Sequence, residues 1–223
     1  HLKITVNDLY EPLMNFWSNL QMFGDELYTE LKNLKITNCN QDSARCLFAE
    51  MKDVINDKTK TDLERAVAFY VVNKCSFSGL GENSSFSRQA SDSNFSMNGI
   101  EKLSGYQNLI KHWKITNLSY EDLLGGEGSF IYLDPPYEIG SNLYGKKGSM
   151  HKYFHHTKFS ETCSHSNHDM IVSYNSSILN KRRFADWKAA EYEHTYTMRS
   201  TGDYIKEQKK RKELVLTNYE TIR

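Results

Sequence analysis

Phe130-Ile131-Tyr132-Leu133-Asp134-Pro135-Pro136-Tyr137 is the stretch of sequence that decides the fold. Its first four residues are apolar and favour extended backbone, so we expect a buried strand at 129–133. Two of the three prolines of the chain follow at once, and proline fixes φ and lacks an N–H, which ends a strand. Because ligands bind at the carboxyl ends of strands in open α/β sheets, Asp134 is a candidate site residue.

Strands and helices alternate on both sides of this stretch. The periodicity of the apolar residues predicts helices at 9–34, 41–54, 61–73, 100–113, 120–124, 153–164 and 176–183. Further strands are expected at 3–6, 114–118, 170–174, 189–197 and 211–219. Thr61 and Glu64 have the spacing of a capping box at a helix start. The alternation predicts an open α/β sheet, and the last two strands in succession predict an antiparallel edge.

The segment from Cys75 to Asn98 differs from the rest of the chain. It is rich in Ser, Asn and Phe and has almost no aliphatic residues, which predicts a long polar loop or an irregular hairpin. A segment of this length without regular structure is usually functional or disordered. We therefore expect three parts, with 74–98 inserted between 1–73 and 99–223.

Composition indicates a globular protein of 223 residues with 39% hydrophobic residues and no apolar run long enough for a membrane helix. Four scattered cysteines favour free thiols and a cytoplasmic, reducing location. Net charge is zero, but residues 1–135 hold 13 Lys and Arg against 18 Asp and Glu, and residues 136–223 hold 15 against 10. The positive second part suits a nucleic-acid partner, although charges scattered over a solvated surface explain the pattern equally well.

The chemistry of residues 134–137 points to an amino group. Consecutive prolines leave carbonyls without a local partner, and Asp134 beside such a carbonyl makes a rigid pair of acceptors. The pair suits an exocyclic amino group with two N–H bonds, whose lone pair it would aim at an electrophile. Tyr137 can stack on a base. The alternative is an ordinary Pro-Pro turn after a strand.

The stretch and its surroundings resemble the Dam-type family of DNA adenine-N6 methyltransferases. Val6-Asn7-Asp8-Leu9-Tyr10 is similar to the family's second strand, and Asn73 to Leu80 with Phe86 is similar to the segment that leads into its target-recognition hairpin. Glu213 to Tyr219 resembles its closing strand, and Thr195 to Ser200 is similar to phage- and virus-encoded members.

The resemblance implies a doubly wound, Rossmann-like α/β fold that uses S-adenosylmethionine to methylate adenine N6 in double-stranded DNA. It implies that Asp134, Pro135, Pro136 and Tyr137 are catalytic and that the target base is flipped out of the duplex. For the cofactor it implies Asp8, with Asn7, Tyr120 and Asp134 beside it. Ser119 stands where many relatives have Asp before the aromatic residue. Asp8 could instead cap the helix that follows.

Seven residues are candidate DNA contacts under this resemblance. They are Lys74, Asn83 and Arg88 in the inserted segment, and Tyr144, Lys146, Lys147 and Lys152 in or beside a basic flap after the catalytic turn. A disordered insertion and a solvated surface loop are the alternative interpretations of these two segments.

The family's glycine-rich cofactor loop has no counterpart in the sequence, and the chain begins with His1. We expect the loop to lie just before residue 1, so that the chain is a piece of an enzyme. The alternatives are a non-catalytic DNA-binding subunit or remnant, and an N-methyltransferase that acts on RNA. We expect no metal, because Cys163, His165, His168 and the pair His155-His156 match no zinc spacing. We also expect a monomer or weak dimer.

Overall fold

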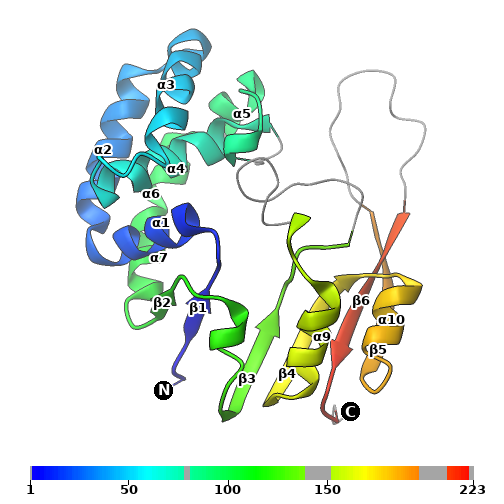
Figure 1. Ribbon diagram of the computed structural model, residues 1–223. Helices are drawn as coiled ribbons and strands as arrows, with labels where there is room; N and C mark the ends of the chain where they lie inside the picture. Colours follow the sequence, from blue (N-terminus) through cyan, green and yellow to red (C-terminus); the bar gives the residue numbers. More distant parts are fainter. Residues whose placement is uncertain (1, 78–80, 139–151, 196–209, 221–223) are drawn as a thin grey trace. The chain divides into compact units, whose positions relative to one another are not determined.

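The structure is a computed structural model that describes residues 2–77, 81–138, 152–195 and 210–220. It divides into two compact units, His1–Tyr120 (unit 1) and Glu121–Arg223 (unit 2), which are described separately below (Figure 1). Helices and strands occur in both units, which confirms the α/β class.

Unit 1 is mainly helical. Its helices are α1 (Glu11–Met22), α2 (Gly24–Thr37), α3 (Gln41–Val54), α4 (Asp62–Cys75), α5 (Arg88–Ser93), α6 (Met97–Glu101) and α7 (Leu103–Ile110), with short 3-10 turns η2 (Gly81–Asn83) and η3 (Tyr120–Asp122), the second of which crosses into unit 2. Strands β1 (Thr5–Asn7) and β2 (Lys114–Thr116) pair in parallel, with Val6 opposite Ile115. The helical segment 11–110 therefore connects two neighbouring parallel strands.

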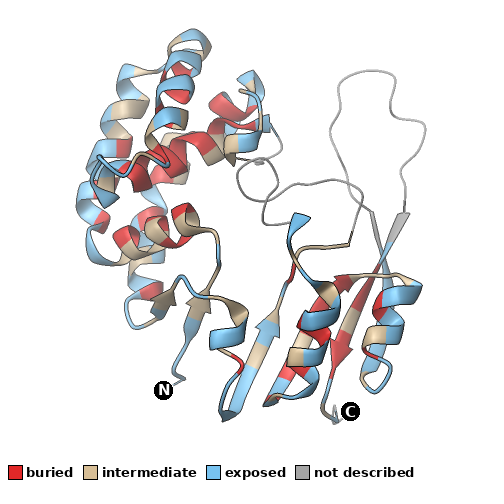
Figure 2. Cartoon of the chain, in the orientation of Figure 1, coloured by how far each residue is buried: buried red, intermediate tan, exposed pale blue. Residues whose placement is uncertain are grey.

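Helix α4 is the centre of the core of unit 1. Nine of its 14 residues are buried, because α1, α2, α3 and α5 all pack against it (Figure 2). The predicted capping box is present: the N–H of Glu64 donates to Thr61 Oγ1 at 3.2 Å, and the N–H of Thr61 donates to Glu64 Oε2 at 2.8 Å. The buried Arg65 side chain of α4 pairs with Glu11 of α1 and with Asp62.

Unit 2 contains a four-stranded sheet in the order β3-β4-β6-β5. The strands are β3 (Glu127–Leu133), β4 (Asn167–Asn175), β5 (Lys188–Thr195) and β6 (Lys210–Thr217). β3 and β4 are parallel, whereas β6 is antiparallel to both of its neighbours, which confirms the predicted antiparallel edge. Helices α9 (His156–Ser164) and α10 (Ile178–Arg183) cover one face of this sheet (Figure 1).

Aromatic side chains form the core between this sheet and its helices. Tyr174 of β4 is fully buried, with its ring centroid 6.3 Å from that of Phe159 in α9 and 6.4 Å from that of Phe184 after α10. Because side chains alternate along a strand, Met170, Val172 and Tyr174 share the covered face. The connection β3–α9–β4 is thus a βαβ unit, and it brings the carboxyl ends of two parallel strands together.

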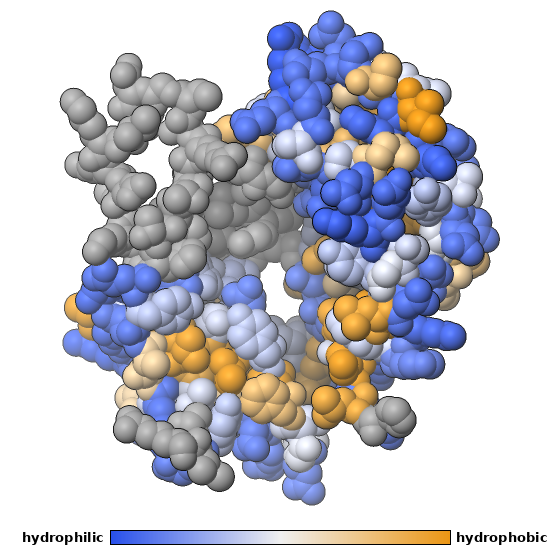
Figure 3. Space-filling model, turned by 180° about the vertical axis from the view of Figure 1, so that it is seen from behind, coloured by the Kyte–Doolittle hydropathy of each residue, from blue (hydrophilic) through white to orange (hydrophobic). Residues whose placement is uncertain are grey.

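The prediction that β3 is a buried strand was wrong. In the described part of the chain β3 is an edge strand with β4 as its partner, and Phe130 and Tyr132 are 62% and 60% exposed. Both lie on the face opposite α9 and α10. Apolar side chains also gather on unit 2 in the view from behind (Figure 3).

One further local prediction needs correction, and for another the structure favours one of its two alternatives. The helix expected over 9–34 is two helices, because the chain turns at Phe23, and a Cβ at Gly24 would lie 2.3 Å from Gln107 of α7. For 75–98 the alternatives were a long polar loop and an irregular hairpin, and the described residues of the segment favour the hairpin and add a short helix. Ser76 and Phe86 form an antiparallel bridge, and residues 88–93 form α5, whose N-cap is Ser87.

Candidate active site

Residues 134–137, which the sequence predicts to be catalytic and which are here called the catalytic turn, leave the carboxyl end of β3 without regular secondary structure. Asp134 is exposed, Pro135 is buried, and Pro136 and Tyr137 are half-buried. Leu133 is opposite Val172 in the parallel pair β3-β4, so the turn passes beside the last residues of β4. The predicted position of Asp134 at a strand end is therefore what the structure shows.

Tyr137 has an aromatic support on one side. Its ring stacks on that of Tyr174, with centroids 6.2 Å apart and an angle of 25° between the planes. Tyr174 is fully buried, and its hydroxyl is bonded to Nδ1 of His156 at the start of α9. The buried tyrosine thereby limits how Tyr137 can turn, which suits a ring that stacks on a base.

Glu138, the residue after the turn, is held by two other elements. Its N–H donates to Asn175 Oδ1 at 2.8 Å, and Asn175 Nδ2 donates to its carbonyl at 3.3 Å. Its carboxylate accepts from Arg183 Nη1 at 2.6 Å and from Nη2 at 3.2 Å. The Arg183 guanidinium lowers the pKa of Glu138 through hydrogen bonding and charge, with a smaller contribution from His156.

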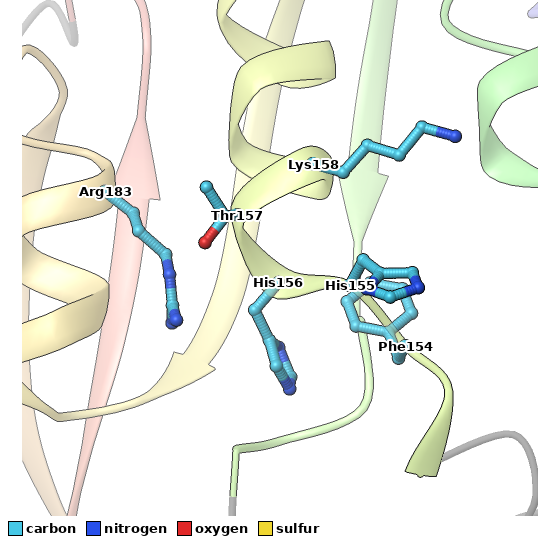
Figure 4. Close-up of a pocket in the computed structure, with 6 residues that line it drawn as sticks. All are labelled: Phe154, His155, His156, Thr157, Lys158 and Arg183. Atoms are coloured by element: carbon cyan, nitrogen blue, oxygen red, sulfur yellow. The ribbon is translucent and has the colours of Figure 1, made fainter.

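An open pocket of about 550 Å³ lies next to this network. It is lined by Phe154, His155, His156, Thr157, Lys158 and Arg183 (Figure 4). Arg183 and His156 extend toward the same side, whereas Lys158 points away from them (Figure 4). Because Arg183 is paired with Glu138 and Lys158 with Glu121 at 2.7 Å, the pocket has little excess positive charge.

The predicted cofactor residues Asn7 and Asp8 lie at the carboxyl end of β1 in unit 1. Asn7 Oδ1 accepts from the N–H of Leu118 at 2.8 Å and its Nδ2 donates to the Leu118 carbonyl at 3.0 Å, so its amide joins β1 to the chain after β2. Asp8 Oδ1 accepts from the N–H of Tyr10 at 2.7 Å. Burial raises the pKa of Asp8, and the Tyr10 N–H acts against this rise.

Asp8 is not the helix cap that the alternative interpretation required. The N-cap of α1 is Tyr10, whose side chain makes no capping hydrogen bond. Asp8 instead accepts a hydrogen bond from the N–H of Tyr10 itself, two residues later, in a turn that precedes the helix. Tyr120, the third predicted cofactor residue, is half-buried in η3.

The three DNA contacts predicted in the inserted segment lie near one another in the chain of unit 1. Lys74 is the next-to-last residue of α4, and its Nζ lies 5.6 Å from the centre of the Tyr70 ring. Asn83 and Arg88 are exposed in η2 and at the start of α5. Lys152 is exposed, whereas Tyr144, Lys146 and Lys147 lie outside the described residues.

Three residues that contact Tyr137 or Glu138 were not predicted from the sequence: Tyr174, Asn175 and Arg183. A signal was available for Asn175, because a polar residue that ends a strand beside another strand end belongs to the same edge of a parallel sheet. No sequence signal joined Arg183 to Glu138, which lies 45 positions earlier.

Two of the side chains weighed as metal ligands, His168 and Cys163, are buried. His168 accepts from the N–H of Ser129 at 3.2 Å and lies 3.2 Å from the Gly125 carbonyl, and burial raises the pKa of Cys163 to about 12. Within the ranges that the structure describes, no group of three or more His, Cys, Asp or Glu side chains could hold a metal ion. No helix in those ranges is long and apolar enough to cross a membrane.

Comparison with known proteins gives one family. A sequence model of the D12 class N6 adenine-specific DNA methyltransferases matches residues 1–198, which is most of the chain. None of the curated proteins compared with the chain matches it. The matched stretch contains Asp8, the inserted segment and the catalytic turn, so the match and the geometry concern the same residues.

Proposed function

The chain belongs to the D12 class N6 adenine-specific DNA methyltransferases, enzymes that methylate adenine N6 in DNA, and we propose that its catalytic turn binds the adenine. The observation that carries the proposal is the position of Asp134, which is exposed at the end of β3. Two prolines and Tyr137 follow it, and the next residue, Glu138, is bonded to Asn175 and Arg183.

Asp134 and the carbonyl of Pro135 would accept the two N–H bonds of the adenine amino group. The lone pair of this nitrogen is delocalised into the ring, and two fixed acceptors favour a pyramidal nitrogen with its lone pair free to attack. Both acceptors also stabilise the positive charge that develops on the nitrogen. Tyr137 would stack on the base, which is worth about 1–3 kcal/mol for an aromatic residue.

The methyl donor in this proposal is S-adenosylmethionine, whose sulfonium makes its methyl group electrophilic. Asp8 suits the ribose of this cofactor, because a half-buried carboxylate at a strand end can accept from hydroxyl groups. Asn7 would act indirectly, since its amide already joins β1 to Leu118. Tyr120 would contact the adenine ring of the cofactor.

The finer fold in this proposal is a doubly wound, Rossmann-like methyltransferase. The parallel pairs β1-β2 and β3-β4, each with helices between its strands, support it. Residues 74–98 would form the target-recognition region between 1–73 and 99–223. The exposure of Asn83, Arg88 and Phe77, which is 47% exposed, supports this role.

Transfer of labelled methyl groups from S-adenosylmethionine tests the proposal. Wild-type protein and Asp134→Ala would be compared on unmethylated DNA and on RNA of the same sequence, with digestion to nucleosides to identify the product. We expect N6-methyladenine from DNA, no product from RNA, and a rate for Asp134→Ala that is lower by at least about 100-fold. Equal rates for the two proteins would contradict the role of Asp134.

A further inference from the structure

The catalytic turn is held at both of its ends. On its amino-terminal side, Leu133 is fixed by the ladder between β3 and β4. On the other side, the side chain of Asn175 bonds to both backbone groups of Glu138, as a neighbouring strand would. Asn175 itself is the last residue of β4, so one strand fixes both ends of the turn.

Helix α10 supplies a second attachment for Glu138. Its carboxylate is paired with both Nη atoms of Arg183, a fork-shaped contact that fixes orientation as well as distance. Asn180, which is fully buried, accepts from Arg183 Nη1 at 2.8 Å and donates to the Asn175 carbonyl at 3.1 Å. The two attachments therefore belong to one hydrogen-bonded network.

The stiffness of the turn makes these attachments matter for chemistry. The rings of Pro135 and Pro136 fix two φ angles, so few torsions between Asp134 and Glu138 can absorb a shift. A displacement of Glu138 is therefore passed back to the Pro135 carbonyl and to Asp134. Misplacement of reacting groups by about 1 Å can lower a rate by about 100-fold.

We propose that Asn175 and Arg183 are positioning residues that keep the catalytic turn in the geometry needed for methyl transfer. They act through Glu138 and do not touch the base. The inference rests on the proposed function of the turn. It assigns to α10 a role in the rate of the chemical step, separate from the binding of DNA or cofactor.

The test measures single-turnover methyl transfer, the dissociation constants for DNA and S-adenosylmethionine, and thermal unfolding of Arg183→Met, Arg183→Lys, Asn175→Ala and Glu138→Gln. Lys181→Met is the matched control, because Lys181 lies on the same helix and pairs with Glu191 at the surface, at 2.6 Å. A double variant, Glu138→Gln with Arg183→Met, tests whether the two residues act together.

We expect Arg183→Met and Asn175→Ala to lower the transfer rate by about 10- to 100-fold, while both dissociation constants stay within about threefold of wild type. The transfer rate of Arg183→Lys should lie between the rates of these variants and that of wild type, because lysine keeps the charge but cannot make the two-nitrogen contact to Glu138. Lys181→Met should match wild type, and the double variant should be no slower than its slower parent.

Variants that fold and keep the wild-type rate would overturn this inference and leave the proposed function standing. So would a weakening of DNA or cofactor binding as large as the loss of rate. Wild-type protein that transfers no methyl group to DNA would overturn the proposed function, and this inference with it.

Discussion

Glu138, which follows the catalytic turn, and Asp8, which follows β1, have pKa values that are shifted in opposite directions. The guanidinium of Arg183 lowers the pKa of Glu138, whereas burial raises the pKa of Asp8. Glu138 is thus a carboxylate with a built-in partner. Asp8 has a bond from one backbone N–H and would gain most from a ligand that donates hydrogen bonds, as the ribose hydroxyls of the proposed cofactor do.

Asp8→Asn should weaken the binding of the cofactor without weakening the stability of the fold. A carboxyl group with a raised folded pKa stabilises the protein at low pH, and this contribution is lost as pH rises through that pKa. At neutral pH the ionised Asp8 therefore costs stability, and Asn can accept the same bond from Tyr10. We expect an unchanged or higher melting temperature and about tenfold or greater loss of affinity for S-adenosylmethionine, measured by calorimetry.

Asp57→Asn is the matched control, because Asp57 Oδ1 accepts from the N–H of Thr59 in the same type of turn, at 2.9 Å. The hydroxyl and N–H of Thr59 lower the pKa of Asp57, so the ionised Asp57 stabilises the protein. Asp57→Asn should therefore lower the melting temperature at pH values above the ordinary pKa of an aspartate, opposite to the effect of Asp8→Asn. Cofactor affinity should not change. Equal affinities of Asp8→Asn and wild type would remove Asp8 from the cofactor site.

At the scale of elements, the sequence indicated those segments whose signals are local. Helix α3 begins and ends at the predicted residues 41 and 54, and the capping box of α4 was visible in Thr61 and Glu64. The break at Phe23 between α1 and α2 was not predicted, because apolar residues continue across it at three- and four-residue spacing.

The candidate site was predictable to a similar extent. Asp134 stands at the end of β3 as expected, because a Pro-Pro pair after an apolar run is a local signal. The exposure of β3 depends on which strands are its neighbours. The bond between Glu138 and Asn175, 37 positions apart, follows from the pairing of β3 with β4, which the local sequence does not specify.

Helix α4 offers a test of the core of unit 1. Thr61→Ala removes the bond to the Glu64 N–H at the start of this helix, and loss of an N-cap costs about 1 kcal/mol. We expect the free energy of unfolding in urea to fall by about this amount. Thr29→Ala, an exposed position inside α2 whose hydroxyl bonds to the Asp25 carbonyl, should change it by a few tenths at most. Equal losses for the two variants would show that the cap contributes nothing.

At the scale of the whole molecule, charge and chemistry point in the same direction. Residues 136–223, which follow the Asp134-Pro135 pair, carry 15 Lys and Arg against 10 Asp and Glu, although the chain as a whole is neutral. The net positive charge of this part of the sequence would attract DNA through its phosphates, without regard to base sequence. Binding of the target adenine itself would rest on the turn, where a few directed hydrogen bonds identify the amino group.

The central claim is that Asp134 binds the N6 amino group of the target adenine, and one double-mutant cycle tests it most directly. Sequencing of methylated DNA locates the target base, and a duplex with purine at that position lacks only the amino group. Equilibrium affinities of wild-type protein and Asp134→Ala are then measured for both duplexes, without methyl transfer. We predict that loss of the amino group weakens binding to wild-type protein by about 10- to 100-fold more than to Asp134→Ala, as expected for a hydrogen bond to a charged group. An equal effect of purine on both proteins would show that Asp134 does not contact the amino group, and would contradict the account.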